Sequence, residues 1–379
     1  MHPLETGLPP EAWATALTTL PGMGPARLVA LLADRGPVEA WAEVAAGVSL
    51  TAAMATAMGP DAPALAARWK AAAPRLDVGA LWRRHVEAGV GVCLQGGPAF
   101  PAALAIDLAP PAVLFHRGEP AALGGPRVAI VGTRRCTRYG LDVARELGRH
   151  LAEAGVGVVS GLAIGIDGAA HAGALEADHV APPIAVVGSG LDVIYPRSHA
   201  VLWRRVCQRG VVLSEAPLGA VPERWRFPAR NRLIAALADV VVVVESPELG
   251  GSMHTVAEAL RRGRPVLAVP GPVRSTASAG TNKLLAEGAA PARDATDVLM
   301  ALGLSPGRLR STRDARTVPA DDDERVLEAF GWQPATLDQL TARTGRPLAE
   351  VALALARLED QGWVAGSGSW YERVARTEP

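Results

Sequence analysis

A basic and aromatic cluster stands directly before the most apolar run of the chain. The segment RFPARNRLIAALADVVVVVES contains Arg226, Phe227, Arg230, Asn231 and Arg232 and ends in five consecutive valines and Glu-Ser. Guanidinium groups pair with phosphate oxygens, and an aromatic ring stacks on a nucleobase. Asn231 offers donors and acceptors to a base edge or to a loop backbone. The cluster therefore indicates a loop that binds nucleic acid. The alternative is a polar helix cap with Phe227 in the core, which explains Asn231 equally well.

Small and hydroxylated residues follow several apolar runs, which we expect to be strands. The ligand-facing candidates at these strand ends are Gly132, Thr133, Arg134, Ser160, Gly161, Gly251, Ser252 and Thr255. Glycine lets a ligand approach the backbone, while hydroxyls and helix N-terminal amides suit phosphate oxygens. Ligands of open α/β sheets bind at the carboxyl ends of strands, so these residues should lie around one site.

Residues from about 127 onward alternate between short β-branched runs and helical stretches, as in RVAIVG, VGVVSG, IAVVGSG and VVLSEAP. Runs without polar alternation indicate strands that are buried on both faces. The alternation with helices predicts an α/β fold with a doubly wound parallel sheet, within a domain over residues 95–302.

The flanking regions predict two smaller helical parts. Residues 1–75 read as a helical domain, and LPGMGPARLVALL (20–32) suggests either a phosphate-binding helix-hairpin-helix or a plain helical hairpin. We expect a linker over 303–320, then three helices and a short ribbon over 321–379. That order predicts a winged helix. Its acidic residues outnumber its arginines, which favours contact with a protein, or a role in packing alone, over contact with duplex DNA.

Bulk composition narrows the class of protein. The formal net charge is zero, so any site for a polyanion must be a local patch. Three cysteines without CxxC spacing predict no disulfide framework, and no His or Cys spacing indicates a metal site. The start of the sequence does not resemble a signal peptide, and no run is long enough to span a membrane. We therefore expect a cytoplasmic protein without a cofactor.

Two enzyme classes are the alternatives. A dinucleotide enzyme would need a GxGxxG loop, but the Gly188-Ser-Gly190 segment lacks the third glycine and runs into Tyr195-Pro196. The glycine loop and glutamate of phosphoribohydrolases of the LOG kind are matched only loosely here, by Gly250, Gly251, Thr255 and Glu258. Asp167 and His171 stand four apart, which suits a helix-face contact as well as an acid–base pair. We predict a protein that is not an enzyme.

Taken together, these stretches resemble the DNA-processing protein DprA (Smf) family of bacterial natural transformation. The motifs VAIVGTRRCTRYG, VVSGLAIGIDGAAH, GSGLDVIYPRSH, LSEAPLG, RFPARNRLIAALAD and AGTNKLLAEGA span residues 127–290 in the family's order. The resemblance implies an extended Rossmann domain that binds single-stranded DNA, preceded by a SAM-like or helix-hairpin-helix-like domain. It also implies a homodimer through the Rossmann domain, protection of incoming strands and loading of the recombinase RecA.

The resemblance assigns DNA contact to the strand-end residues given above together with Phe227, Arg230, Asn231, Arg232 and Lys283. Two departures from the family pattern stand out. Ile164 occupies a position that is often basic in relatives, and the loop SPELGGSMHT is less regular than the usual glycine-serine run.

Overall fold

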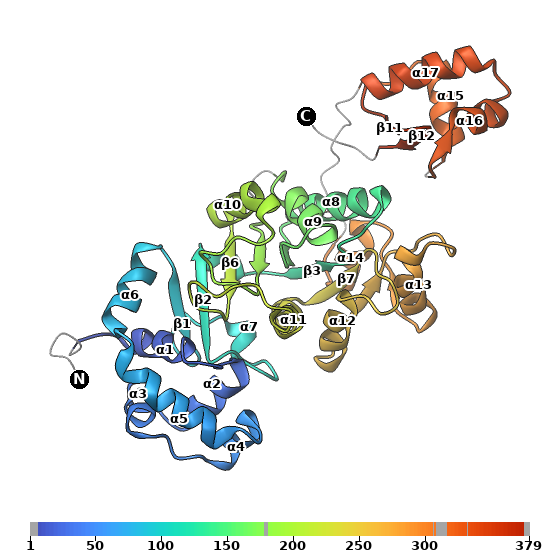
Figure 1. The fold of residues 1–379 in the computed structure, drawn as a ribbon. Helices are drawn as coiled ribbons and strands as arrows, with labels where there is room; N and C mark the ends of the chain where they lie inside the picture. The colour runs from blue at the N-terminus through green and yellow to red at the C-terminus, as the bar shows by residue number, and fades with distance from the viewer. Residues whose placement is uncertain (1–6, 178–180, 306, 308–316, 332, 375–379) are drawn as a thin grey trace. The chain divides into compact units, whose positions relative to one another are not determined.

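The computed structural model describes residues 7–177, 181–305, 307, 317–331 and 333–374. The chain divides into two compact units, Met1–Leu309 and Arg310–Pro379 (Figure 1). Most of the predicted linker, 303–320, lies outside the described residues, and the predicted boundary between 1–75 and 95–302 stays a prediction. Among the described helices, none is both long and apolar enough to cross a membrane.

The first unit alternates strands and helices as the sequence predicted. Its α-helices are α1 (Pro10–Thr18), α2 (Pro25–Leu32), α3 (Pro37–Ala46), α4 (Ala52–Met58), α5 (Ala62–Ala72), α6 (Val78–Glu87), α7 (Ala102–Ala105), α8 (Arg138–Glu153), α9 (Ile166–Ala174), α10 (Ala200–Arg209), α11 (Arg226–Leu237), α12 (Ser252–Arg261), α13 (Ala279–Ala286) and α14 (Ala295–Ala301). Its strands are β1 (Gly91–Leu94), β2 (Val113–Gly118), β3 (Arg127–Val131), β4 (Gly157–Ser160), β5 (Ile184–Val186), β6 (Val211–Ser214), β7 (Val240–Val243), β8 (Val266–Ala268) and β9 (Ala290–Pro291).

The strands form one sheet in the order β1-β2-β6-β5-β4-β3-β7-β8-β9. Strands β1 and β2 are antiparallel additions at one edge, and from β6 to β9 all neighbours run parallel. The chain builds outward from β3 to β6 and then returns to place β7 on the other side of β3. The order therefore reverses between β3 and β7, and this switch point is where open α/β sheets place their ligands.

Both faces of the sheet are covered, which confirms the doubly wound prediction. Val128 and Ile130 of β3 pack with α8, α9 and α14, whereas Ala129 and Val131 pack with α11 and α12. Figure 1 shows α8 and α9 on one side of β3 and β7, and α11 and α12 on the other. Successive side chains of a strand point to opposite faces, so a strand between two helical layers must be apolar throughout.

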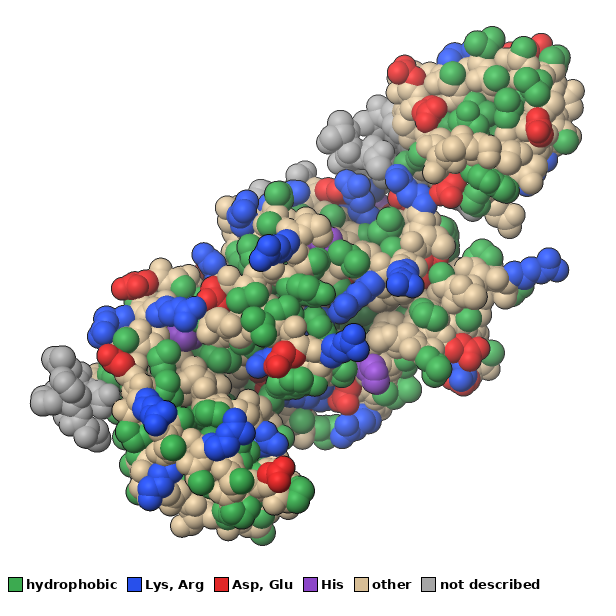
Figure 2. All heavy atoms as spheres, in the orientation of Figure 1, with side chains coloured by type: hydrophobic (Ala, Val, Ile, Leu, Met, Phe, Trp, Pro, Cys, Tyr) green, Lys and Arg blue, Asp and Glu red, His purple; other side chains and the backbone are tan. Residues whose placement is uncertain are grey.

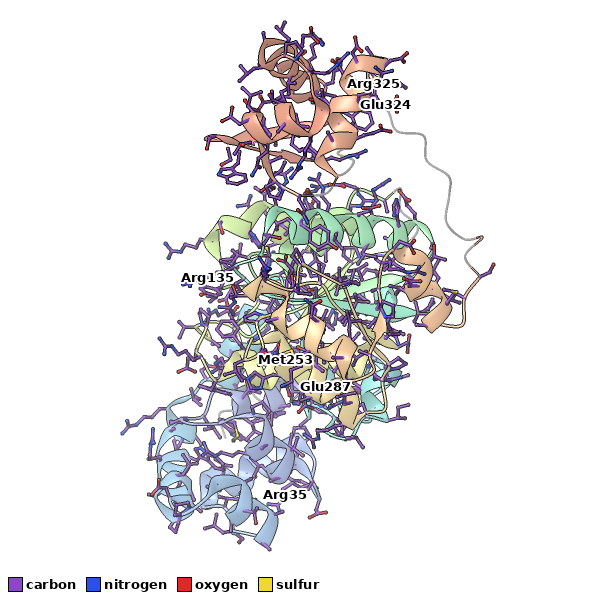
Figure 3. The ribbon with its side chains drawn as sticks, turned by 90° about the vertical axis from the view of Figure 1, so that its right-hand side faces the viewer. Arg35, Arg135, Met253, Glu287, Glu324 and Arg325 are labelled. Carbon is purple, nitrogen blue, oxygen red and sulfur yellow. The ribbon has the colours of Figure 1, made fainter. Side chains whose placement is uncertain are left out.

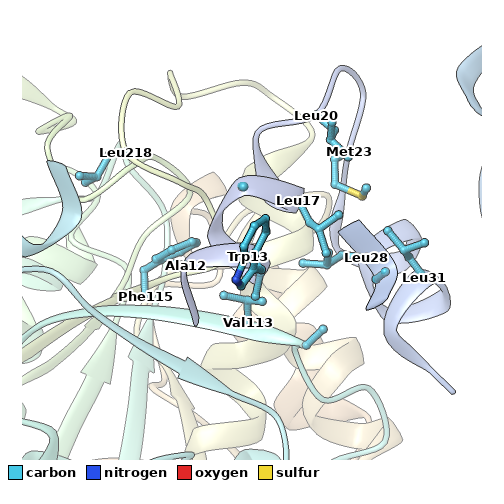
Figure 4. Packing of buried hydrophobic residues seen from close by; sticks show 14 of the residues in the cluster. Ala12, Trp13, Leu17, Leu20, Met23, Leu28, Leu31, Val113, Phe115 and Leu218 are labelled. Atoms are coloured by element: carbon cyan, nitrogen blue, oxygen red, sulfur yellow. The ribbon is translucent and has the colours of Figure 1, made fainter. Parts of the chain in front are cut away.

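The N-terminal helices share a core with the antiparallel edge of the sheet. Trp13 and Leu17 of α1 and Leu28 of α2 belong to the same buried cluster as Val113 and Phe115 of β2 (Figure 4). The turn between α1 and α2 is held from within, because Trp69 Nε1 donates to the carbonyl of Pro21 at 2.9 Å. A turn therefore joins α1 and α2 at the predicted glycines, and Trp69 of α5 holds it; we call this segment, residues 10–32, the helical hairpin.

The second unit has the element order of a winged helix, as predicted. Its elements are α15 (Asp321–Phe330), β10 (Ala335–Thr336), α16 (Leu337–Thr344), α17 (Leu348–Asp360), β11 (Val364–Ser367) and β12 (Trp370–Arg373). The strands form a small antiparallel sheet in the order β10-β12-β11. Phe330, Leu340 and Leu355 meet in its core, and Asp323 pairs with Arg357 at 2.5 Å.

One local prediction was wrong. Residues 226–232, expected as a loop, form the first two turns of α11, which begins at Arg226. Pro228 does not prevent this, because the N–H groups of a first helical turn have no partner inside the helix.

Candidate nucleic-acid interface

A groove of about 410 Å³ lies at the switch point, which we call the central groove. It is lined by Val131, Gly132, Thr133, Arg134, Arg135, Ala163, Asp167, Phe227, Pro228, Arg230, Asn231, Ile234, Pro247, Gly250, Gly251, Ser252, His254 and Thr255. The loops after β3 and β7 form its two walls, and the start of α11 closes one side. Three arginines face a single acidic residue here. The chain as a whole has no net charge, but this groove carries a local basic patch. A site for a polyanion in such a chain needs a patch of this kind.

The helical start of α11 decides which side chains reach the groove. Phe227, Arg230 and Asn231 are spaced i, i+3 and i+4, so they share one face of the helix. Arg232 lies about 100° further round the helix and leaves this face. Its guanidinium instead donates to the carbonyl of Ala109 and pairs with buried Glu215. The structure therefore brings three of the four predicted α11 residues together.

Phe227 lies between a cation and a second aromatic ring. The guanidinium carbon of Arg134 lies 4.8 Å from the Phe227 ring centroid, and the Tyr195 ring lies 5.7 Å away. Arg134 is exposed, and it forms no ion pair with any described residue. An exposed guanidinium on an aromatic face offers both a phosphate partner and a stacking surface. Arg135, in the same loop, is marked in Figure 3.

Arg230 forms the buried floor of the groove. Its side chain donates to the carbonyl of Val186, and Nε has no partner among the described residues. Burial lowers the pKa of Arg230 to about 10, although nearby Asp167 acts to raise it. Burial also raises the pKa of Asp167, against the pull of Arg230 and of the Gly161 and Ala163 amides. The two opposite buried charges thus partly offset each other electrostatically, and Arg230 adds positive potential at the floor of the groove.

Arg230 and Asp167 lie so close to position 161 that only glycine fits there without a shift of their side chains. Its N–H donates to Asp167 Oδ2 at 3.2 Å. A Cβ at this position would lie 2.2 Å from Arg230 Nη1 and 2.5 Å from Asp167 Oδ2. Gly161 therefore serves the floor of the site through its size. Neighbouring Ser160 is fully buried and donates to the Ile130 carbonyl at 2.7 Å, so it does not face the groove.

The loop after β7 gives the groove an open helix start. Gly251 caps α12, and a Cβ added to it would meet nothing within 4 Å. Asn231 Nδ2 donates to the Gly251 carbonyl at 3.3 Å and so ties this loop to α11. Ser252 donates to Ser246 at 2.8 Å, and Thr255 is buried below it. Free amides at a helix start attract phosphate.

The helix start on the other wall is closed by a carboxylate. Thr137, the cap of α8, donates its N–H to Glu245 Oε2 at 2.8 Å and its hydroxyl to Oε1 at 2.6 Å. Glu245 is 1% exposed. In dinucleotide-binding folds the helix start after the first strand holds the pyrophosphate. Here the protein's own anion occupies that place, which argues against a dinucleotide cofactor.

The remaining predicted residues fall outside the central groove or at its border. Lys283, on α13, has a half-exposed side chain near Glu287 and does not line the groove. Ile164 is 43% exposed and lines a smaller neighbouring hollow. Its exposed side chain leaves an apolar surface there.

Asp167 and His171 do not form an acid–base pair in the structure. His171 Nε2 is 3.1 Å from the Ile184 carbonyl, whereas Asp167 is engaged with Gly161 and Arg230. His171 is fully buried, and burial lowers its pKa to about 4. Among the described residues, no group of three or more His, Cys, Asp or Glu side chains is placed to hold a metal ion.

Sequence reasoning missed two residues of the site. Tyr195 was treated as an interruption of a glycine motif, yet it contacts Phe227. Glu245 was passed over at the end of the valine strand, yet it closes the α8 start. The sequence did contain a signal for Glu245, because it directly follows the apolar valine run. A charge at the end of a buried strand needs a buried partner, so its pairing could have been predicted.

Basic side chains are frequent on the face of the first unit that Figure 2 displays, interspersed with hydrophobic ones. This mixture suits a ligand that has both charged phosphates and apolar base faces.

Comparison with known proteins agrees with this geometry. Residues 92–303 match the family described as DNA recombination-mediator protein A, and residues 310–367 match the DprA winged helix domain. A Mycobacterium tuberculosis protein, provisionally named DNA processing protein DprA, is 43% identical over 260 residues, covering 66% of each chain. The match therefore spans slightly less than two thirds of that relative. Protein Smf of Escherichia coli is 37% identical over 274 residues, covering 70% of this chain and 72% of its own.

Two solved structures share the fold. DNA processing protein A from Streptococcus pneumoniae is 29% identical, with a TM-score of 0.61, over 77% of this chain and 96% of its own. DNA processing protein A from Helicobacter pylori, described for its mode of binding single-stranded DNA, is 32% identical, with a TM-score of 0.51. It covers 56% of this chain and 95% of its own. With the sheet order, the switch-point groove and the C-terminal winged helix, these matches show that the chain belongs to the DNA recombination-mediator protein A (DprA) family.

Proposed function

We propose that the central groove binds single-stranded DNA without sequence preference. The observation that carries this proposal is the exposed Arg134 guanidinium on the Phe227 ring, at the mouth of a basic groove. Arg134 and Arg135 pair with phosphates, and the amides of Gly251 and Ser252 donate to a further phosphate oxygen. Phe227, with Tyr195 beside it, provides the stacking surface for a base. Stacking requires an unpaired base and tolerates every base type, so single strands of any sequence should bind.

The family relationship supports a wider role. The family is described as recombination mediators, and its Helicobacter pylori member is described as binding single-stranded DNA. We infer that this chain protects incoming single strands during natural transformation and loads the recombinase RecA onto them. The resemblance further supports a homodimer through the Rossmann domain.

The same site argues for binding without catalysis. Asp167 is engaged with Arg230 and the Gly161 amide, and Glu245 is engaged with Thr137. His171 is fully buried against the start of β5, and burial lowers its pKa. General acid–base chemistry needs a proton carrier within hydrogen-bond reach of the substrate. These candidates are instead committed to the interior.

The test is fluorescence anisotropy with a labelled oligonucleotide, comparing single strand with duplex over a salt series. Removing Phe227 (F227A) should weaken single-strand binding by about 1–3 kcal/mol, the range found for stacking on an aromatic side chain. Removing the charge of Arg134 (R134A) should flatten the slope of log K against log salt by about 0.7, because one phosphate contact is lost. R261A, which removes an arginine that is 68% exposed outside the groove, is the matched control.

Arg230 is a poor first target, because its removal would leave Asp167 buried without its cation and so destabilise the fold. If R134A and F227A both retain wild-type affinity and salt slope, the central groove is not the DNA site. If no strand binds at all, the groove volume of about 410 Å³ still suits a small ligand, and nucleoside monophosphates should then be tested.

A further inference from the structure

Three hollows follow one another along the carboxyl edge of the sheet. Beside the central groove lies an inner pocket that contains Gly161, Ile164, Gly188 and Tyr195. Beyond it lies an edge pocket between the start of α2, the loop after β6 and α11. The inner pocket shares Arg134, Phe227 and Arg230 with the central groove and shares Gly188 and Arg230 with the edge pocket. Arg230 therefore lies beneath all three.

The order of the hollows follows the order of the strands. The edge pocket lies at the ends of β6 and β5, the inner pocket at β5 and β4, and the central groove at β3 and β7. Neighbouring strands are about 4.8 Å apart, so the row spans roughly 19 Å from β6 to β7. This is long enough for an extended chain to cross several strands.

An exposed tryptophan stands at the far end of this row. Trp225 lines the edge pocket and is 46% exposed, which is unusual for the largest apolar side chain. The Arg226 guanidinium lies 4.6 Å from the ring centroid. The ring approaches the helical hairpin, because a Cβ on Gly24 would lie 4.0 Å from it. This repeats the arrangement of Arg134 on Phe227.

The acidic groups near Trp225 are already paired. Glu223 accepts from Trp225 Nε1 and from Arg226 Nε, each at 3.0 Å. Glu215 pairs with Arg232 inside the protein. Neither carboxylate therefore presents an uncompensated charge to a phosphate on this side of the row.

We propose that Trp225 is a second base-stacking site, so that a bound single strand runs from the central groove along the carboxyl edge to the helical hairpin. This inference rests on the proposed function of the central groove. The edge pocket holds only about 40 Å³, little more than a water molecule occupies, so a base would stack on the outer surface of Trp225. The N-terminal helices would then border the DNA path, and the site would have a minimum strand length.

The experiment compares the full chain with W225A, W225F and F227A, using oligothymidylates from about 4 to about 16 nucleotides. W225A should bind the longest strands about tenfold more weakly and the shortest strands as the wild type does. W225F should restore most of the affinity, because a smaller ring still stacks. The matched control is W370A, which removes an equally exposed tryptophan, 46%, from the second unit.

A second readout locates the contact directly. An oligonucleotide carrying one photoreactive thymine at its end should crosslink to the peptide that contains Trp225 when the strand is long, and not when it is short. Equal affinity of W225A and wild type at every length, or an equal loss at every length, overturns the extended path. An F227A variant that binds like the wild type instead refutes the central groove, and it does so independently of the result for Trp225.

Discussion

The two helix starts that flank the switch point differ in what faces them. At α8 the cap Thr137 gives its N–H and hydroxyl to Glu245, which is 1% exposed. At α12 the cap Gly251 faces open space. Both starts follow adjacent parallel strands and carry the same partial positive charge. One is neutralised by a buried carboxylate of the chain, and the other has no side-chain cap.

This difference shows how one helix start of a Rossmann-like sheet can be filled by the chain's own carboxylate while the neighbouring start stays uncovered. The buried charges Asp167, Arg230 and Glu245 are committed to the fold, as is the buried ring of His171. The exposed arginines Arg134 and Arg135 project from the loop before α8, and the small residues Gly250 and Gly251 line the loop before α12. Substitutions of the buried groups should therefore act on stability, and substitutions of the exposed groups should act on binding.

The largest effect is expected from Glu245→Ala. Two hydrogen bonds to a charged acceptor would be lost and the α8 start left without its partner, which should cost about 3–5 kcal/mol of unfolding free energy. Urea unfolding followed by tryptophan fluorescence would measure it. The control is Glu248→Ala, which removes an exposed carboxylate from the same loop. A loss below about 1 kcal/mol for Glu245→Ala would show that solvent replaces the carboxylate and that the α8 start is open.

The next effect concerns His171 and pH. Its pKa is about 4 in the folded state against 6.5 ordinarily, so the unfolded chain takes up the proton first as the pH falls. The stability associated with the neutral ring is complete above about pH 6.5 and declines toward pH 4, by about 2–3 kcal/mol. Melting temperatures measured over this range should fall less steeply for His171→Gln than for the wild type. His254→Gln, on the exposed start of α12, is the matched substitution. Parallel pH profiles for His171→Gln and wild type would contradict the burial of this ring.

The smallest effect comes from a pair of glycines at the two helix starts. A Cβ on Gly140, in α8, would lie 2.4 Å from Glu245 Oε2, whereas a Cβ on Gly251 would meet nothing within 4 Å. Gly140→Ala should therefore destabilise the fold by about 1–2 kcal/mol. Gly251→Ala should leave stability unchanged or raise it by a few tenths of a kcal/mol. Thermal unfolding of the two variants would decide, and equal effects would remove the distinction between the closed and open starts.

The architecture of this protein could be predicted from local patterns. The valine run predicted a strand buried on both faces, and β7 is buried between α11, α12 and α14. Strand-end glycines predicted a shared edge, because parallel strands all end on the same side. The order of helices and ribbon over 321–379 predicted the winged helix. Periodicity and turn chemistry depend on neighbouring residues, so they can be read without a structure.

The direction of individual side chains was decided by tertiary structure. Arg232 and Arg230 are both arginines in one motif, but the helical start at Arg226 turns Arg232 toward Glu215 and Arg230 beneath the groove. Ser160 ends β4 and Lys283 lies on α13, in the elements that the sequence predicted, but neither side chain lines the groove. Composition and spacing determined that this protein has a basic, aromatic strand-end site. Tertiary packing decided which charged side chains are paired inside the protein and which stay exposed. The sequence could not show this, because the buried partners come from distant segments.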